Sequence, residues 1–315
     1  MEYITYLSAL DQSMQPAAIW AAEGDEPRPL VVSLHTWSFG MNPVGMFYIE
    51  ECKKRNWHCI YPHFRGPNWT PEACGSDLVV SDLTSAVQYM KEHYAVDEKR
   101  VFLAGGSGGG HAALLMAGRN PELWSAVSAW CPISDLTEWY KQVNKKKNNP
   151  DVVSYDNHIA EACGGDPTTC PQAAAEAEHR SPLTWLKNAK DKLIIDIGTG
   201  IHDGHTGSVP VSHAILAYNE LANPEDRISQ EDIDYMVEKE AVPAHLLFEG
   251  EDPAYCTYKV LLRRTSGMVR LTLFEGGHNI LVGTSFGFLE NQVAGNAPVW
   301  YSGDGANLVA EELAK

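Results

Sequence analysis

The sequence predicts an α/β protein in which a mostly parallel sheet is covered by helices on both faces. Short apolar runs rich in β-branched residues alternate along the chain with longer segments whose apolar residues recur every three or four positions. This alternation is typical of strands joined by crossover helices. With 44% hydrophobic and 21% charged side chains, the 315 residues have the composition of a globular protein with a full apolar core.

Seven segments are predicted as strands, because each is a short and mainly apolar run. They are Ala17–Ala21, Leu30–His35, His58–Phe64, Val101–Gly106, Ala126–Cys131, Leu193–Gly198 and Val269–Glu275. Four segments between them have the apolar spacing of a helix packed on a sheet. They are Val44–Arg55, Asp77–Tyr94, Gly108–Arg119 and Val211–Leu221.

Two polar intervals interrupt this alternation, Leu136–Leu186 and Asn223–Arg264, the second with an acidic helix predicted at Gln230–Ala241. Both follow predicted strands, and ligands of open α/β sheets bind beyond the carboxyl ends of the strands. We therefore expect a single domain over residues 1–315, with cap-like insertions at about 136–186 and 223–264. Surface decoration without a role in binding is the alternative.

The charge balance argues against anionic partners. The chain has 24 Lys and Arg against 41 Asp and Glu, a formal charge of −17 that repels nucleic acid and anionic membranes. Its one basic run, Lys145–Lys147, is typical of a solvated face.

No apolar run is long enough to span a bilayer, and the N-terminus has no signal-peptide pattern. We expect no nucleic-acid or membrane partner and a cytoplasmic protein, or a secreted or periplasmic one if a leader was removed. The oligomeric state stays open.

Seven cysteines are too few for a disulfide scaffold in a chain of this length. A structural zinc site is not expected either, since paired CxxC motifs and HExxH are missing from the sequence. Their odd number leaves at least one free thiol in a monomer. A bridge between Cys163 and Cys170, in one Gly- and Pro-rich loop, remains open.

The most informative motif is Gly105-Gly106-Ser107-Gly108-Gly109, because it joins the predicted strand Val101–Gly106 directly to a helix. A Gly-x-Ser-x-Gly turn in this context exposes a serine nucleophile on a sharp strand-to-helix elbow. The flanking glycines are needed where a Cβ would strike neighbouring backbone. A phosphate-binding loop is the competing interpretation, but the Lys and Ser or Thr of such a loop do not follow.

A serine hydroxyl needs a base to take its proton, and His278 follows a strand and two glycines that bring the loop over the serine. The base in turn needs a carboxylate. We expect Asp203, which lies in the loop beyond the preceding strand, and keep Asp196 and Asp135 as alternatives.

His202, Asp203 and His205 also have donor types that bind metal ions. The triad already explains Asp203, and we expect no metal and no cofactor.

Acyl transfer also requires amide donors for the developing oxyanion. One donor is expected from Gly108, and the other from Trp37 in the turn after Leu30–His35. The alternative is that the Trp37 indole only lines the pocket.

Taken in order, these segments resemble the prolyl oligopeptidase-like branch of the α/β-hydrolases, which includes bacterial carbohydrate and acetyl esterases. The resemblance is carried by the His35 turn, Phe64-Arg65-Gly66, the Ser107 elbow, Ser181–Trp185, the Asp203 loop with Val209-Pro210, and Gly-Gly-His278. It implies an eight-stranded sheet and the triad Ser107, Asp203 and His278. The sequence departs from the oligopeptidases in having no room for a β-propeller before Leu30, and from many esterases in lacking His-Gly-Gly after the first strand.

The function expected from this set is a serine esterase that deacylates a small or carbohydrate-linked ester. Aromatic residues in predicted loops, Trp69, Trp139 and Trp185, are candidates to stack on sugar or aryl groups, with plain packing as the alternative. A propeller-free serine peptidase is the second hypothesis, because amide hydrolysis uses the same residues. An inactive binding protein is the third.

Overall fold

The computed structural model describes residues 1–41, 46–144, 154–300 and the backbone of 311–312. Val44, where the first helix was expected to begin, and the basic run Lys145–Lys147 lie outside these residues.

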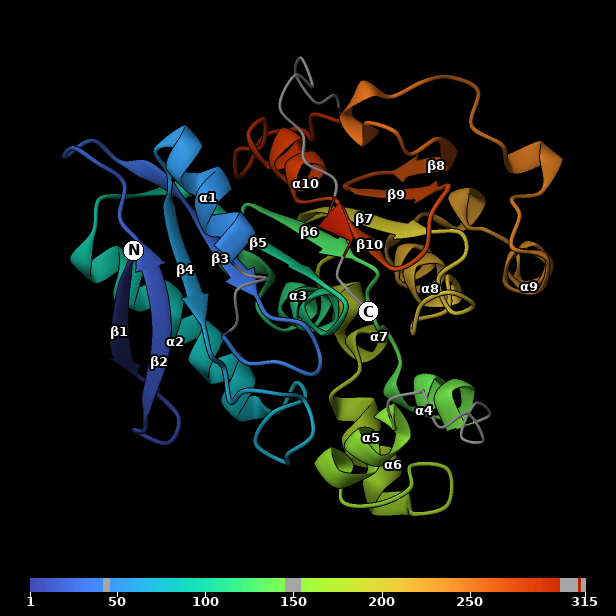
Figure 1. Ribbon diagram of the computed structural model, residues 1–315, viewed down its shortest axis with the longest axis horizontal. Coiled ribbons are helices and arrows are strands. Elements are labelled where there is room, and N and C mark those ends of the chain that lie inside the picture. The colour runs from blue at the N-terminus through green and yellow to red at the C-terminus, as the bar shows by residue number, and fades with distance from the viewer. Residues whose placement is uncertain (42–45, 145–153, 301–310, 313–315) are drawn as a thin grey trace.

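The core of the described chain is a sheet with strand order β1-β2-β4-β3-β5-β6-β7-β9-β8 (Figure 1). Its strands are β1 (Glu2–Leu7), β2 (Met14–Trp20), β3 (Arg28–Leu34), β4 (His58–Pro62), β5 (Val96–Gly106), β6 (Ala126–Trp130), β7 (Ile194–Gly200), β8 (Val260–Ser266) and β9 (Val269–Phe274). A separate two-stranded sheet pairs β10 (Asn279–Ile280) with β11 (Glu311–Glu312).

The sheet is parallel from β4 through β3, β5, β6 and β7 to β9, as the alternation of strands and helices predicts. Antiparallel strands close both edges, β1 and β2 at one and β8 at the other. The described part of the sheet thus has nine strands, one more than the eight that the resemblance implied. Neither β1 nor β8 is among the seven strands predicted from the sequence, and β8 begins inside the interval 223–264 that was expected to be an insertion.

Helices cover the sheet on both faces, and others lie away from it. The helices of the described residues are α1 (Met46–Arg55), α2 (Asp77–His93), α3 (Gly108–Arg119), α4 (Leu136–Asn144), α5 (Tyr155–Cys163), α6 (Pro171–His179), α7 (Pro182–Trp185), α8 (Ser212–Leu221), α9 (Gln230–Lys239) and α10 (Val282–Leu289). Single-turn 3-10 segments occur at Pro121–Leu123, Leu186–Asn188, Pro224–Asp226, Ala244–Leu246 and Pro253–Tyr255. Helices α2, α3, α8 and α9 share one apolar core with the sheet, and α1 and α10 share another on the opposite face (Figure 1).

Helices α4–α7, which we call the cap, connect β6 to β7, and α4, α5 and α6 stand away from the sheet (Figure 1). They have a small core of their own, which we call the cap core. It contains buried residues of α4, α5 and α6, among them Trp139, Ile159 and Ala173. Four buried residues from outside these helices belong to the same core, namely Trp37, Cys74, Ile133 and Val209. The interval expected to be an insertion therefore folds as a helical unit that packs on loops of the main body.

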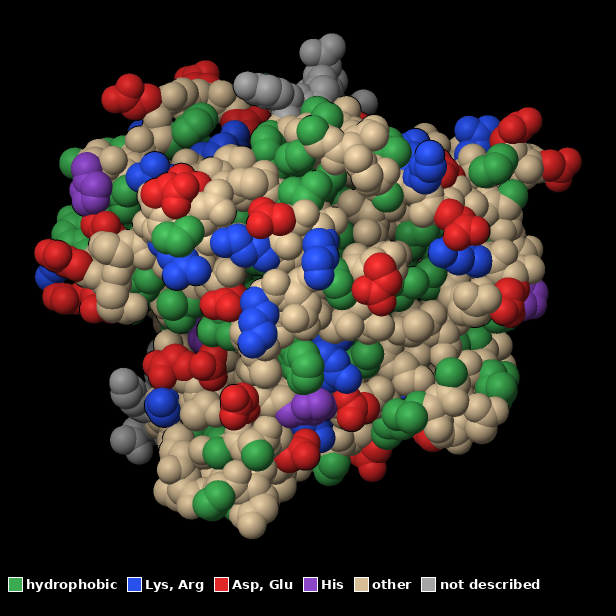
Figure 2. All heavy atoms as spheres, turned by 180° about the vertical axis from the view of Figure 1, so that it is seen from behind, with side chains coloured by type: hydrophobic (Ala, Val, Ile, Leu, Met, Phe, Trp, Pro, Cys, Tyr) green, Lys and Arg blue, Asp and Glu red, His purple; other side chains and the backbone are tan. Residues whose placement is uncertain are grey.

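Charges of both signs are interspersed over the face opposite the view of Figure 1 (Figure 2). No helix in the described ranges is both long and apolar enough to cross a membrane. All seven cysteines carry free thiols, so Cys163 and Cys170 are not bridged.

Candidate active site

Ser107 occupies the turn between β5 and α3 with φ 58° and ψ −121°, a backbone conformation that side chains other than glycine rarely adopt. Its amide donates to the Trp130 carbonyl at 2.9 Å, and its carbonyl accepts from the His111 amide at 2.9 Å, which starts the helix. A Cβ on Gly105 would lie 2.6 Å from the carbonyl oxygen of Gly109. The strained turn therefore depends on glycine beside the serine, as the motif predicts.

Asp203 and His278 are joined by a direct hydrogen bond. His278 Nδ1 lies 2.7 Å from Asp203 Oδ2, the carboxylate is fully buried, and the imidazole is 19% exposed. Asp203 Oδ1 accepts from the amides of Gly204 at 2.9 Å and Val209 at 3.2 Å. With Nδ1 committed to the carboxylate, Nε2 is left to exchange a proton with another group.

Neighbouring strands bring these residues to one edge of the sheet. β7 precedes Asp203 and β9 precedes His278, and the amide of His202 donates to the Gly276 carbonyl at 2.9 Å to hold the two loops together. Cys131, directly after β6, has its sulfur within 4.8 Å of donor atoms of both Asp203 and His278. Ser107 bonds to the residue before Cys131, so the serine elbow and the Asp–His pair lie together at the carboxyl ends of the strands.

The alternative acids have other partners. Asp196 faces Arg270 in a buried ion pair, with oxygen-to-nitrogen distances of 2.7 and 2.9 Å. Asp135 accepts a hydrogen bond from the amide of Glu138 at 2.9 Å at the start of α4. Of the three acids considered from the sequence, Asp203 is the one bonded to His278.

Burial and two neighbouring side chains act in opposite directions on His278. Burial lowers the pKa of His278, but its interactions with Asp203 and Cys131 together raise it by more, so the pKa lies well above its ordinary value. Burial raises the pKa of the Cys131 thiol, which also donates to the Asn279 carbonyl at 3.4 Å. The thiol next to the imidazole is therefore neutral near pH 7.

Two groups of side chains have the donor types that could bind a metal ion. Cys131, Asp203 and His278 have donor atoms within 4.8 Å of one another, although the Asp–His hydrogen bond and the protonated thiol oppose a metal there. His202, one of the histidines considered from the sequence, instead bonds Glu240 at 2.9 Å and Glu275 at 2.6 Å. His205 bonds the Val237 carbonyl at 2.7 Å, so the two histidines do not converge on Asp203.

The Trp37 amide lies beside Gly108. A Cβ built on Gly108 would be 2.5 Å from both the nitrogen and the Cα of Trp37. Nothing among the described residues accepts a hydrogen bond from the Trp37 amide, while the Trp37 carbonyl accepts from the Asn68 amide at 2.9 Å. The Gly108 amide, in the first turn of α3, is also without an intrahelical acceptor. Two amides near Ser107 are therefore available to a negatively charged oxygen.

Gly207 provides a test of the Asp–His pair. A Cβ at this position would lie 2.6 Å from His278 Cβ and closer still to Asp203 Oδ1. We expect Gly207→Ala to push the two side chains apart and to lower kcat by roughly 100-fold, the cost of a displacement of about 1 Å in a catalytic constellation. Steady-state kinetics on the variant, with its unfolding measured in urea, would check this; native kcat in a folded variant would contradict it.

The three tryptophans expected in the pocket have different surroundings. Trp69 is half-buried and contacts the His158 ring at a centroid distance of 4.9 Å. Trp139 is 1% exposed and packs in the cap core, which leaves no free face for a sugar ring. Trp185 contacts Gly118 and Arg119 at the far end of α3, roughly 15 Å of helix from the Ser107 turn, so it does not line the site.

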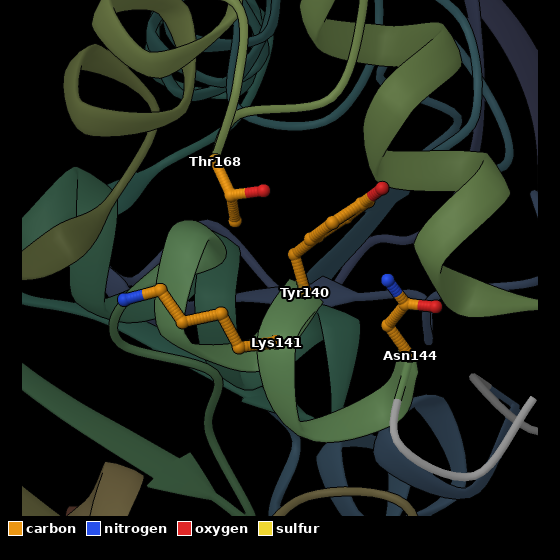
Figure 3. A pocket seen from close by; sticks show the side chains of 4 residues that line it. All are labelled: Tyr140, Lys141, Asn144 and Thr168. Carbon is orange, nitrogen blue, oxygen red and sulfur yellow. The ribbon is translucent and has the colours of Figure 1, made fainter.

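A separate open cavity of about 480 Å³ lies on the cap, lined by Tyr140, Lys141, Asn144 and Thr168 (Figure 3). None of these residues belongs to the serine elbow or to the Asp–His pair. Cys131, Gly207 and Val209 contact the Asp–His pair, but none of them was assigned a role from the sequence. Val209-Pro210 was named there as one of the segments that carry the family resemblance.

Comparison with protein families matches residues 75–241, more than half of the chain, to the prolyl oligopeptidase family. Comparison with curated proteins finds no match. Among solved structures, oligopeptidase B from Leishmania major has a TM-score of 0.57 at 14% identity, with 88% of this chain and 33% of that chain covered. The acylaminoacyl peptidase of Pyrococcus horikoshii gives 0.56 at 14% identity, with 88% and 37% covered.

The acetyl xylan esterase from Paenibacillus sp. R4 gives a TM-score of 0.54 at 18% identity, with 70% of this chain and 74% of that chain covered. This chain thus spans about a third of the two peptidases and most of the esterase. All three have the α/β-hydrolase fold.

Proposed function

The chain belongs to the prolyl oligopeptidase family and is a serine hydrolase of the α/β-hydrolase fold, and from this we propose that it hydrolyses small carboxylic esters, including esters carried on carbohydrates. The observation that carries the proposal is the buried Asp203–His278 hydrogen bond beside the strained Ser107 turn. A base positioned near a serine on a strained turn is what nucleophilic acyl transfer requires.

In the proposed first half-reaction, Ser107 Oγ attacks the ester carbonyl carbon while Nε2 of His278 takes the hydroxyl proton. The carbonyl oxygen becomes an oxyanion that accepts hydrogen bonds from the amides of Gly108 and Trp37. The tetrahedral intermediate then expels the alcohol, which takes the proton from His278, and Ser107 is left acylated.

In the second half-reaction, His278 takes a proton from water, and the resulting hydroxide attacks the acyl carbon. Collapse of the second tetrahedral intermediate releases the carboxylic acid and returns the proton to Ser107. Asp203 holds the imidazole in the tautomer with Nδ1 protonated and stabilises its charged form.

The extent of the similarity to the acetyl xylan esterase supports an ester substrate. This chain covers 74% of that enzyme and 33% of oligopeptidase B, so the esterase is matched over most of its own length. A serine peptidase is the second candidate, favoured by the family match and by the peptidases among the similar structures. An inactive binding protein would not need a strained serine or a paired acid and base.

Hydrolysis of p-nitrophenyl acetate and butyrate, compared with hydrolysis of a proline-containing aminoacyl nitroanilide, tests this proposal. We expect turnover of the esters, and acetate release from acetylated xylan, with at least 100-fold lower kcat/KM on the nitroanilide. Exclusive cleavage of the nitroanilide would establish a peptidase. Inactivity on every substrate would support the binding protein.

A further inference from the structure

Trp139 on α4 contacts two parts of the candidate site at once. Its indole meets the Trp37 indole edge-on, with ring centroids 4.7 Å apart and an angle of 77°. Its Nε1–H donates to the Ser208 carbonyl at 2.9 Å. Trp37 provides one of the two free amides beside Ser107, and Ser208 precedes Val209, whose amide bonds Asp203 Oδ1. Trp139 therefore lies between the oxyanion turn and the loop of the triad acid.

The cap core also includes one residue of the oxyanion turn and one of the loop that carries Asp203. Trp37 and Val209 lie outside the cap, yet both are buried in the cap core with Trp139, at 2% and 1% exposure. The cap core thus buries Trp37, from the turn with the oxyanion amide, and Val209, from the loop that carries Asp203. Because packed interiors do not deform gradually, the positions of these two residues depend on the cap side chains between them.

We propose that Trp139 is a positioning residue for acyl transfer, which couples the turn carrying the Trp37 amide to the loop carrying Asp203. Its ring supports the Trp37 indole and so fixes where the Trp37 amide points. Its N–H holds the backbone at Ser208 and so fixes the Val209 amide on Asp203. This role rests on the proposed function, since it needs both an oxyanion donor and a triad acid.

Trp139→Phe tests the hydrogen bond, because phenylalanine keeps an aromatic ring against Trp37 but has no N–H. The matched control is Trp185→Phe. Trp185 is also in the cap and donates Nε1–H to a carbonyl, that of His179, at 2.8 Å, but far from the site. Each variant loses one indole-to-carbonyl hydrogen bond, so a general effect on cap stability appears in both.

We expect Trp139→Phe to lower kcat by roughly tenfold, the rate equivalent of one hydrogen bond, with KM within twofold of native. The acid limb of the kcat/KM profile should move to lower pH, because a looser Asp203 raises the pKa of His278 by less. Trp185→Phe should leave kcat and the acid limb unchanged. Equal kinetics for the two variants would overturn the proposal.

The rate at which a fluorophosphonate labels Ser107 provides a second readout that needs no ester substrate. It depends on the activated serine and on the oxyanion donors, so it should fall in Trp139→Phe and not in Trp185→Phe even if the natural substrate is an amide. Normalising kcat to the labelled fraction removes any contribution from unfolded protein. If Trp139→Phe does not fold, Trp139→Tyr removes the same N–H, and a native labelling rate in that variant would contradict the coupling.

Discussion

Ser107→Ala is expected to lower kcat for ester hydrolysis by about 10⁵- to 10⁶-fold, as the loss of the nucleophile does in other serine hydrolases. Without the hydroxyl no acyl-enzyme forms, and the remaining acceleration comes from binding and from the Gly108 and Trp37 amides. The substitution also replaces a side chain at φ 58° by a smaller one, so the elbow should persist. Burst kinetics with p-nitrophenyl acetate should lose both the burst and the steady-state phase.

Ser154→Ala is a suitable control for this variant. Ser154 is an exposed serine of the cap that precedes α5 and makes no capping hydrogen bond through its side chain. Its replacement should leave both kinetic phases intact. Turnover by Ser107→Ala within tenfold of the native rate would mean that another group is the nucleophile.

Asp203→Asn is expected to lower kcat by about 10⁴-fold, because the amide no longer selects the catalytic tautomer of His278. It should also change the pH dependence. In the native protein His278 must be neutral to act as a base, and the Asp203 carboxylate holds its pKa well above the ordinary value. The acid limb of native kcat/KM should therefore lie above pH 6.5, with activity lost as the pH falls through it.

Asparagine removes the charge that raises the pKa of His278, while the burial that lowers it remains. The acid limb of the Asp203→Asn variant should thus move to lower pH even as kcat falls. Asp135→Asn is the matched control, because asparagine still accepts the Glu138 amide at the start of α4. An unchanged acid limb in Asp203→Asn would show that His278 does not depend on this carboxylate.

Local sequence predicted the parts of the site that depend on local backbone geometry. The elbow is one continuous segment, so the order of its glycines and serine is enough to identify it. Helix α3 begins and ends at the predicted residues, Gly108 and Arg119. The strands that carry the loops of Asp203 and His278 are buried and mainly apolar, so they are recognisable from composition.

Edge strands are harder to predict, since one side of such a strand is open to solvent. In β1 only Tyr6 is buried, so its sequence does not show the continuous apolar run of a central strand. In β8 the arginines at 263 and 264 interrupt the apolar pattern. β8 was therefore placed in an insertion, although it pairs with β9 and closes the sheet.

Contacts between distant segments could not be predicted from local sequence. Trp139 and Trp185 look alike in sequence, as tryptophans in the same polar interval. The fold buries Trp139 between Trp37 and Ser208, and places Trp185 against Arg119 at the other end of α3. Gly207 likewise shows its role only once the fold brings it against both Asp203 and His278.

The most direct test of the account is labelling of the native protein with a fluorophosphonate, followed by mass spectrometry of its peptides. We expect Ser107 Oγ to displace fluoride and form one phosphonate ester per chain, on the peptide that contains Ser107, and we expect His278→Ala to abolish labelling. A label on any other residue, or labelling of Ser107 that persists at the native rate without His278, would contradict the proposed serine hydrolase mechanism.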